Sequence, residues 1–216
     1  MTLIEAVNSV LVRLREDEVS SYKESKYAKM VREFINDALI HVENSWDWSM
    51  LRASVQVNVV PDIFSYVMPY VYANSEIDKV ICQECNTYLE YRNGDWFSDK
   101  YLNSDSVEVG SPRYYTINGT DATGNTVIDI YPKPNTTYTL YVETVKRTQR
   151  LQYDDEQITV PYHPVVMLAT AFAIRERGEV GSDTVNEMLI AAKNSLSDWI
   201  AIDAERNKDE LVWRSV

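Results

Sequence analysis

Carboxylates are the most abundant reactive groups of this chain, and three of them stand in succession at Asp154, Asp155 and Glu156. Two carboxylates can serve as the acid and the base or nucleophile of a glycoside hydrolase, provided that both face one cleft at a fixed separation. These three lie instead just ahead of a helix that is expected to begin at Pro161. Acidic residues in that position usually serve solvation or stabilise the helix N-terminus. We therefore expect no catalytic pair here.

The histidines and cysteines do not supply another catalytic or metal site. His41 falls in an amphipathic helical stretch and His163 at the start of a helix, so we expect ordinary helix residues rather than the base of a triad. Cys82 and Cys85 form one Cys-x-x-Cys, but a zinc site would need two further ligands. Because residues three apart in an extended segment point to opposite faces, we expect two ordinary thiols.

Motifs for nucleotide or protease chemistry are missing from the sequence as well. It contains no Gly-x-Ser-x-Gly, no phosphate-binding glycine loop and no His-Glu-x-x-His. We expect a protein that is not an enzyme and that needs neither a metal nor a cofactor.

Lys146, Arg147 and Arg150 form a basic cluster close to the acidic one. The two clusters could join neighbouring subunits through charge contacts, and a DNA contact is the alternative. The formal charge of −12, from 33 acidic and 21 basic residues, argues against a surface that grips nucleic acid through many phosphates. An acidic wall can still surround DNA, because it lets the DNA pass without holding it.

Two amphipathic helices are expected in the first fifty residues. Thr2-Leu-Ile-Glu5 is a capping box, in which a hydroxyl and a carboxylate satisfy free amides at a helix start, and a helix of about four turns follows. Ser21-Tyr-Lys-Glu24 repeats that pattern ahead of a wide apolar stripe. This second helix should end near Asn44.

From Ala53 the hydrophobic period changes to two, which predicts strands. The stretch 55–59 should form a hairpin with 64–68 across Pro61-Asp62, and Asn93-Gly94 and 120–124 should be turns. A short helical turn is expected at 96–102. The remaining strands of an antiparallel sheet of about seven strands are expected at 76–82, 87–91, 113–117, 127–131 and 137–145.

Two more helices and a tail complete the chain. The third helix should start at Pro161, be apolar on most sides and stop at Gly178, and Thr184-Val-Asn-Glu187 should cap the fourth. A charged spacer then precedes the last apolar residues. Those residues form an arm that buries its tryptophan in a neighbouring molecule, or else a frayed tail, and we favour the arm for the group Leu211, Val212, Trp213 and Arg214.

The order of these elements predicts an α+β fold. We expect an antiparallel helix bundle made of two N-terminal and two C-terminal helices, with an inserted antiparallel β lobe. The parts are a helical half at 1–52, the β lobe at 53–150, the second helical half at 151–205 and an extended C-terminal arm at 206–216. No stretch approaches a membrane span and no signal segment is visible, so we expect a cytosolic product without a membrane partner.

Five segments in this order resemble the head-to-tail adaptor (tail tubular protein A-like) family of short-tailed, podovirus-type phages. The segments extend over much of the chain, from the end of the second helix to the start of the third. They are Ser45-Trp-Asp-Trp48, Gly110-Ser-Pro-Arg-Tyr-Tyr115, Val127-Ile-Asp-Ile-Tyr131 with Pro132-Lys-Pro134, the strand 139–145 ending in Lys146-Arg147, and Pro161-Tyr-His-Pro164.

The resemblance implies a structural virion protein that forms a homo-oligomeric ring, usually of twelve subunits, at the head-tail junction. Such a ring lies between the portal protein and the tail nozzle protein, is assembled in the host cytoplasm, and lets double-stranded DNA pass without sequence-specific binding. The arm at 211–214 would then dock on the portal or on a neighbouring subunit. Two alternatives stay open: a cell-wall-degrading tail enzyme that uses Asp154, Asp155 and Glu156, and a tail receptor or fibre-binding module built on the sheet.

Overall fold

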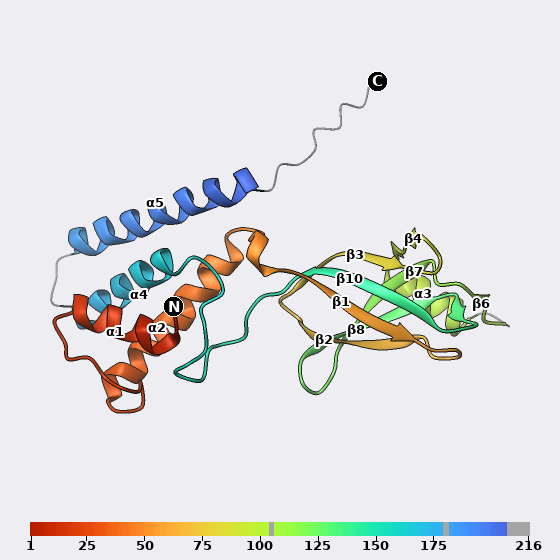
Figure 1. Cartoon of the computed structure of the whole chain (residues 1–216), viewed down its shortest axis with the longest axis horizontal. Helices are drawn as coiled ribbons and strands as arrows, with labels where there is room; N and C mark the ends of the chain where they lie inside the picture. The colour runs from red at the N-terminus through yellow and green to blue at the C-terminus, as the bar shows by residue number, and fades with distance from the viewer. Residues whose placement is uncertain (104–105, 179–181, 207–216) are drawn as a thin grey trace, which may run out of the picture. The chain divides into compact units, whose positions relative to one another are not determined.

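The computed structural model describes residues 1–103, 106–178 and 182–206, and the chain divides into two compact units (Figure 1). The helical unit comprises Met1–Leu51 and Thr148–Val216, and the β unit comprises Arg52–Arg147. The described residues form five α-helices and ten strands. The fold is therefore mixed α+β, as the sequence predicts.

Helix α1 (Leu3–Arg13) begins with the predicted capping box. The Glu5 amide donates to Thr2 Oγ1 at 3.3 Å, and the Thr2 amide donates to a Glu5 carboxylate oxygen at 2.8 Å. Its eleven residues make about three turns rather than the expected four. The helix ends because Leu14 leaves the helical region and Arg15 adopts a left-handed φ of 59°.

Helix α2 (Lys26–Asn44) starts one turn later than the predicted cap, so the capping box at Ser21 is wrong. Ser25 is the N-cap, and its hydroxyl accepts from the Ala28 amide at 2.9 Å. The Ser21 hydroxyl donates instead to Asp154 at 2.7 Å. A long-range hydrogen bond has replaced the local one that the sequence pattern indicates.

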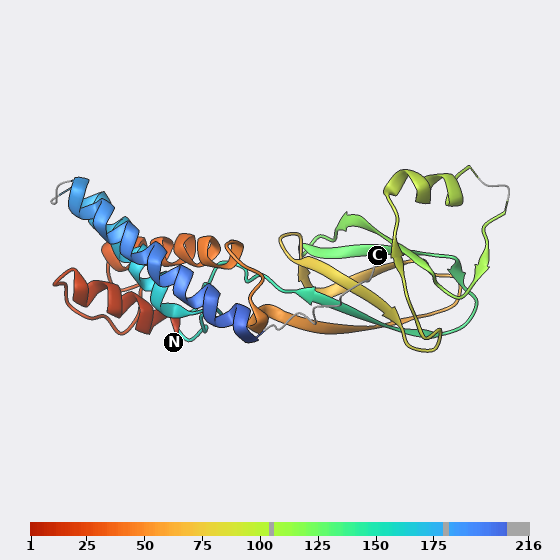
Figure 2. The same cartoon turned by 90° about the horizontal axis from the view of Figure 1, so that it is seen from above.

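Helix α4 (Tyr162–Arg177) is the central helix of this unit and contacts α1, α2 and α5 (Ser182–Arg206) (Figure 2). Gly178 ends it with a left-handed φ of 65°, as predicted. Helix α5 begins two residues before the predicted cap at Thr184 and packs along α4 through a narrow seam. The buried residues of α5 are Val185, Ala192, Leu196 and Asp203.

The β unit contains two four-stranded sheets rather than the single sheet expected, together with a pair of two-residue strands. The first sheet has the order β1 (Arg52–Val59), β10 (Tyr138–Val145), β3 (Glu76–Cys82), β4 (Thr87–Tyr88). The second has the order β2 (Ser65–Tyr72), β8 (Asn125–Tyr131), β7 (Tyr114–Thr120), β5 (Glu90–Tyr91). The short pair is β6 (Val109–Gly110) with β9 (Lys133–Pro134). Pairing is antiparallel except between β5 and β7 and between β6 and β9, which are parallel.

The two sheets bury one apolar core between them, in the manner of a β-sandwich. Both sheets contribute through alternate residues of their strands, which is why the period-two pattern located most strands correctly. The core residues are Val55, Val57, Val59, Met68, Val71, Val80, Cys82, Leu89, Tyr115, Ile128, Ile130, Tyr138, Leu140 and Val142.

The predicted hairpin between 55–59 and 64–68 is wrong. Strand β1 pairs with β10, and β2 pairs with β8, so the chain changes sheets at the connection. Asp62 has a positive φ of 67°, and the Tyr66 hydroxyl accepts from the Val60 amide at 3.0 Å and donates to the Ile63 carbonyl at 2.8 Å. Alternation specifies which face of a strand is buried, but it does not specify the partner strand.

Asn93-Gly94 is a helix start rather than the expected turn. The Asn93 side chain accepts from the Trp96 amide at 3.1 Å and caps α3 (Gly94–Tyr101), the short helix expected near this position. The turn expected at 120–124 is confirmed, with Gly124 at a φ of 84°. Bonds from Asn125 and Thr123 hold the pKa of Asp121 in that turn at about 2.

The two cysteines form a disulfide rather than the expected free thiols. Cys82 is the last residue of β3, and the chain turns immediately after it. The Asn86 amide donates to the Gln83 carbonyl at 3.2 Å, and Asn86 has a positive φ of 48°. The argument from opposite faces holds only within an extended strand, and this segment leaves the strand between its two cysteines.

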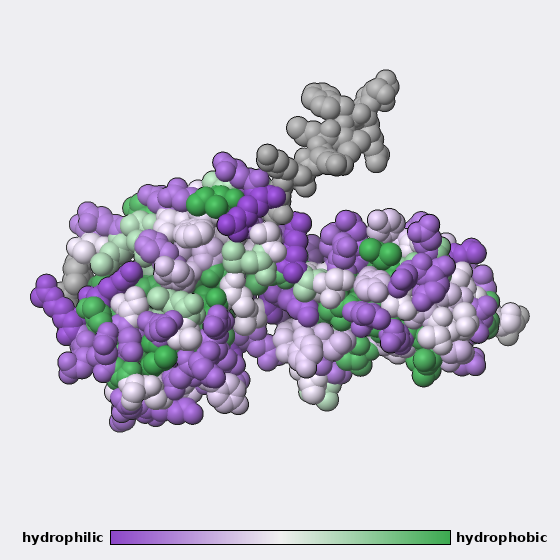
Figure 3. Space-filling view, viewed as in Figure 1, coloured by the Kyte–Doolittle hydropathy of each residue, from purple (hydrophilic) through white to green (hydrophobic). Residues whose placement is uncertain are grey.

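None of the helices in the described part of the chain is long and apolar enough to cross a membrane. Exposed apolar side chains are scattered among polar ones on the face drawn in Figure 3.

Candidate functional site

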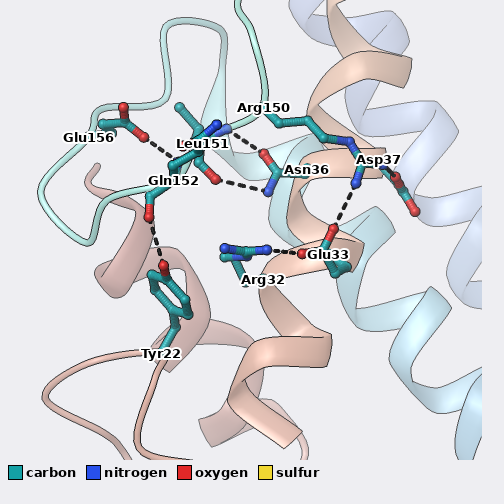
Figure 4. A network of polar contacts seen from close by, with 9 residues as sticks. All are labelled: Tyr22, Arg32, Glu33, Asn36, Asp37, Arg150, Leu151, Gln152 and Glu156. Carbon is teal, nitrogen blue, oxygen red and sulfur yellow. Dashed lines mark hydrogen bonds and ion pairs between the residues drawn. The ribbon is translucent and has the colours of Figure 1, made fainter. Parts of the chain in front are cut away.

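The segment 148–160, which leads into α4, is bound to α2 by a network of polar contacts (Figure 4). Asn36 of α2 is only 1% exposed. Its Oδ1 accepts from the Leu151 amide at 2.7 Å, and its Nδ2 donates to the Leu151 carbonyl at 3.2 Å. One side chain thus satisfies both backbone groups of a buried residue, as a neighbouring strand would.

Arg150 extends this network along the surface of α2. Its guanidinium donates to Glu33 at 2.7 Å and to Asp37 at 2.6 Å, two carboxylates one helical turn apart. The Arg150 side chain is 53% exposed, so solvent screens both ion pairs. The residue is therefore already paired within its own unit.

Two of the three predicted carboxylates accept hydrogen bonds within the helical unit, and the backbone carbonyls of the same two residues accept from the first turn of α1. Asp154 accepts from the Ser21 hydroxyl at 2.7 Å and from the Tyr22 amide at 3.1 Å. Glu156 accepts from the Tyr153 amide at 2.9 Å, and its backbone carbonyl accepts from the Leu3 amide at 2.8 Å. Asp155, between them, is exposed. Asp154 and Glu156 thus stabilise the loop ahead of α4 and its contacts with α1 and the segment before α2.

The other two basic residues of the predicted cluster belong to the β unit. The Lys146 ammonium lies 5.8 Å from the centre of the Tyr70 ring. The Arg147 amide donates to the Ser75 hydroxyl at 3.3 Å. Lys146 and Arg147 therefore have contacts in one unit and Arg150 in the other.

A polar hollow of about 390 Å³ adjoins the network of Figure 4 and is lined in part by Tyr22, Lys23, Arg32 and Arg150. The Arg32 guanidinium lies 4.7 Å from the centre of the Tyr22 ring and pairs with Glu33. The hydrogen bond to Glu33 raises the pKa of Arg32 above its ordinary value. Within the described residues, Arg32 Nε is buried without a hydrogen-bond partner.

The end of α5 is fastened to the segment that follows α2 by Asp203, a buried carboxylate that is 3% exposed. It accepts from Trp46 Nε1 at 3.0 Å, from the Ser49 amide at 3.0 Å and from the Ser49 hydroxyl at 2.5 Å. Burial alone would raise the pKa of Asp203, but these bonds and the charge of Arg206 outweigh it, so the pKa lies below its ordinary value. The neighbouring Trp48 is fully buried and donates to the Val42 carbonyl at 2.8 Å.

An apolar groove of about 320 Å³ lies where α4 and α5 meet the end of α1. We call it the α4–α5 groove, and its lining residues are Arg13, Met167, Thr170, Met188 and Ala191. Both methionines are half-buried, Thr170 is buried, and Arg13 and Ala191 are exposed. Methionine side chains adapt their shape readily, and they recur at protein-binding surfaces.

The two histidines stay ordinary helix residues. His163 Nδ1 lies 2.9 Å from the Ser195 hydroxyl and links α4 to α5, and His41 is exposed on α2. Among the described residues, no group of three or more histidine, cysteine or acidic side chains is placed to hold a metal ion.

In the β unit, α3 packs its aromatic residues on the second sheet. Trp96 contacts the rings of Tyr114 and Tyr131 with centroids 4.9 and 5.3 Å apart. The Tyr101 hydroxyl donates to the Ile130 carbonyl at 2.6 Å, and burial, followed by the charge of Asp129, raises the pKa of Tyr101 well above its usual range. This is a packed and satisfied cluster, typical of a structural role.

A family model described as SU10 adaptor protein matches residues 1–206, and so extends over both units. The chain belongs to the SU10 adaptor family. This is a family of phage head-to-tail adaptors, and the adaptor family predicted from the order of the sequence motifs is thereby confirmed. A comparison with curated proteins finds no match.

Membership makes this SU10 adaptor a structural protein of the phage particle. The predicted motif Ser45-Trp-Asp-Trp48 supplies Trp46 and Trp48 to the junction of α2 with α5. The predicted arm residues Leu211, Val212, Trp213 and Arg214 lie outside the described residues. Sequence reasoning missed Asp203 and Asn36. Asp203 did offer a signal, because it continues the apolar side of α5, and an aspartate is rarely buried without a partner.

Proposed function

We propose that the protein is a head-to-tail adaptor that forms a closed ring, dodecameric in its mature form, between the portal and the tail nozzle. The family match over residues 1–206 carries this proposal. In such a ring each copy meets its neighbours through two different surfaces, a heterologous arrangement that closes on itself.

In this proposal α1, α2, α4 and α5 act as an antiparallel bundle that meets the portal, and the β unit is directed to the tail. Residues 211–214 form the arm that contacts the portal or a neighbouring copy, and the group Lys146, Arg147, Arg150, Asp154, Asp155 and Glu156 supplies charge contacts between copies. Asp155 is the exposed member of the acidic triplet, and Arg150 keeps half of its surface accessible despite its two ion pairs. These two residues are the most available for such contacts.

Electron microscopy of the full chain with and without its portal protein tests the proposal. A ring that appears with portal supports it, and an absence of both ring and portal binding would refute it. A variant with Leu211, Val212 and Trp213 replaced by serine should lose the ring. The matched variant Lys208→Ser lies outside the proposed contact and should keep it.

The charge of the protein suits a passage for DNA rather than a binding surface. With 33 acidic and 21 basic residues, a ring of these chains repels the phosphate backbone. We expect no retention of duplex DNA by the assembled ring even at about 50 mM salt, where phosphate contacts are strongest. Fluorescence anisotropy of a labelled duplex measures this, and tight binding at low salt would contradict the proposed passage.

A further inference from the structure

The α4–α5 groove has the character of a docking site within the helical unit. Helix α5 buries only a narrow seam against α4, and its flank at Met188 and Ala191 stays open beside Met167. The volume of about 320 Å³ lies at the lower end of the range for binding pockets, roughly 300–1,000 Å³. The groove therefore suits a side-chain anchor rather than a large ligand.

The chain contains one segment whose chemistry complements this groove. Beyond α5, the sequence Asp209-Glu210 is followed directly by Leu211-Val-Trp213. Apolar side chains match the methionines of the groove, and tryptophan is a frequent anchor at interfaces. The two carboxylates match Arg13, the cation at the groove rim.

Chain length argues that this segment reaches the groove of another copy rather than its own. Ala191 lies fifteen residues before Arg206 on α5, a distance of roughly 22 Å at 1.5 Å per residue. Trp213 is seven residues beyond Arg206, and a fully extended chain of that length spans at most about 25 Å. Met188, on the far side of the groove, lies eighteen residues before Arg206, roughly 27 Å along the helix. Because the chain must also reverse direction after α5, the backbone at Trp213 does not reach Met188 of its own groove.

We propose that the α4–α5 groove receives the segment 209–213 of a neighbouring copy, with Trp213 as its anchor. The inference rests on the proposed ring and specifies how adjacent copies are joined. Each copy offers one groove and one segment, so the contact is heterologous and can repeat around a closed ring. The segment links each subunit to the next.

Photo-crosslinking of full-length protein tests this contact. Trp213 is replaced by p-benzoylphenylalanine, whose excited carbonyl inserts into nearby C–H bonds and reacts well at methionine. Equal amounts of unlabelled and ¹⁵N-labelled protein are mixed, assembled on the portal and irradiated. We expect crosslinked peptides that contain Met167 or Met188, with about half of them joining a heavy to a light chain, as random mixing in a ring requires.

Two variants on the same helix provide the specificity control in chains that keep Trp213. Ala191→Glu places a charge in the groove and should reduce ring formation on the portal at least tenfold. Ile190→Glu changes the adjacent residue, which is 57% exposed and outside the groove lining, and should leave ring formation unchanged. Equal effects of the two variants would overturn the groove assignment.

The outcomes separate this inference from the proposed function. Suppose that rings form on the portal, but the probe at position 213 crosslinks to the portal or to another part of the neighbouring copy. This result overturns the groove contact and leaves the adaptor role intact. If no crosslink joins a heavy chain to a light chain, the segment 209–213 contacts its own copy, and the proposed contact between neighbouring copies is overturned. Absence of portal binding and of rings overturns both proposals.

Discussion

Asp203 offers the sharpest test of how the helical unit is held together. Its carboxylate accepts from Trp46 Nε1, from the Ser49 amide and from the Ser49 hydroxyl. Hydrogen bonds to a charged group contribute about 1.5–3 kcal/mol each, against about 0.5–1.5 kcal/mol for neutral pairs. Asp203→Asn keeps the shape but removes the charge, so we expect a loss of about 1–3 kcal/mol in the free energy of unfolding.

Asp203→Ala should cost more. It leaves two N–H donors, on Trp46 and Ser49, without their acceptor, and each unsatisfied donor costs about 1–3 kcal/mol. The expected total is about 2–6 kcal/mol. The matched control is Asp198→Asn, an exposed carboxylate on the same helix, which should change stability by less than about 0.5 kcal/mol.

The effect of Asp203→Asn should also depend on pH. The folded-state pKa of Asp203 lies below its ordinary value of 3.8, because bonds and charge outweigh burial. A lowered pKa means that the unfolded chain binds the proton more readily, so the stabilisation is present above that ordinary value. It is lost as pH falls through the lower folded-state pKa. The difference between wild type and Asp203→Asn should thus be constant near neutral pH and shrink below about pH 4.

Urea denaturation followed by circular dichroism at 222 nm is the appropriate assay, because α1, α2, α4 and α5 of the helical unit dominate that signal. Linear extrapolation with unchanged m-values gives the difference in free energy. If Asp203→Asn and Asp198→Asn lose equal stability, or if the difference grows toward low pH, the reasoning about this carboxylate is refuted.

Three further changes test other parts of the fold. Asn36→Leu removes both hydrogen bonds to the Leu151 backbone and should lower the free energy of unfolding by about 2–4 kcal/mol in urea denaturation. A loss under about 1 kcal/mol would show that these two bonds are dispensable. Gly178→Ala places a side chain at a φ of 65°, with no atom within 4 Å of the new Cβ. We therefore expect only the backbone cost of about 1–2 kcal/mol, seen as a lower Tm in calorimetry, and an unchanged Tm would contradict this. Tyr101→Phe deletes the bond to the Ile130 carbonyl and should cost about 1–2 kcal/mol by tryptophan fluorescence, and a stabilised variant would argue against that bond.

Local chemistry explains the parts of the fold that could be predicted from sequence. The alternation at Val55, Val57 and Val59 places these residues in the sandwich core, and the capping box at Thr2 and the stop at Gly178 act through neighbouring residues only. Each of these signals depends on a few consecutive positions, so the sequence contains all the information needed to read it.

Long-range pairing explains what could not be predicted. The Ser21 hydroxyl bonds Asp154, 133 residues away, and that contact displaced the expected helix cap. Asp203 likewise accepts from the Ser49 amide, 154 residues away in sequence, and no local pattern indicates that bond. The disulfide was missed for a local reason, because the strand ends at Cys82 as predicted and the chain turns before Cys85, so the argument from opposite faces does not apply to this pair.

The division of the helical unit between the two ends of the described chain has a consequence during synthesis. The β unit is complete once Arg147 has left the ribosome, but α1 and α2 must wait for α4 and α5. About 60 further residues are needed, which takes about 3–12 s at 5–20 residues per second. The faces of α1 and α2 that contact α4 stay uncovered for that time, so the nascent chain holds a folded β unit and two helices that await their partners.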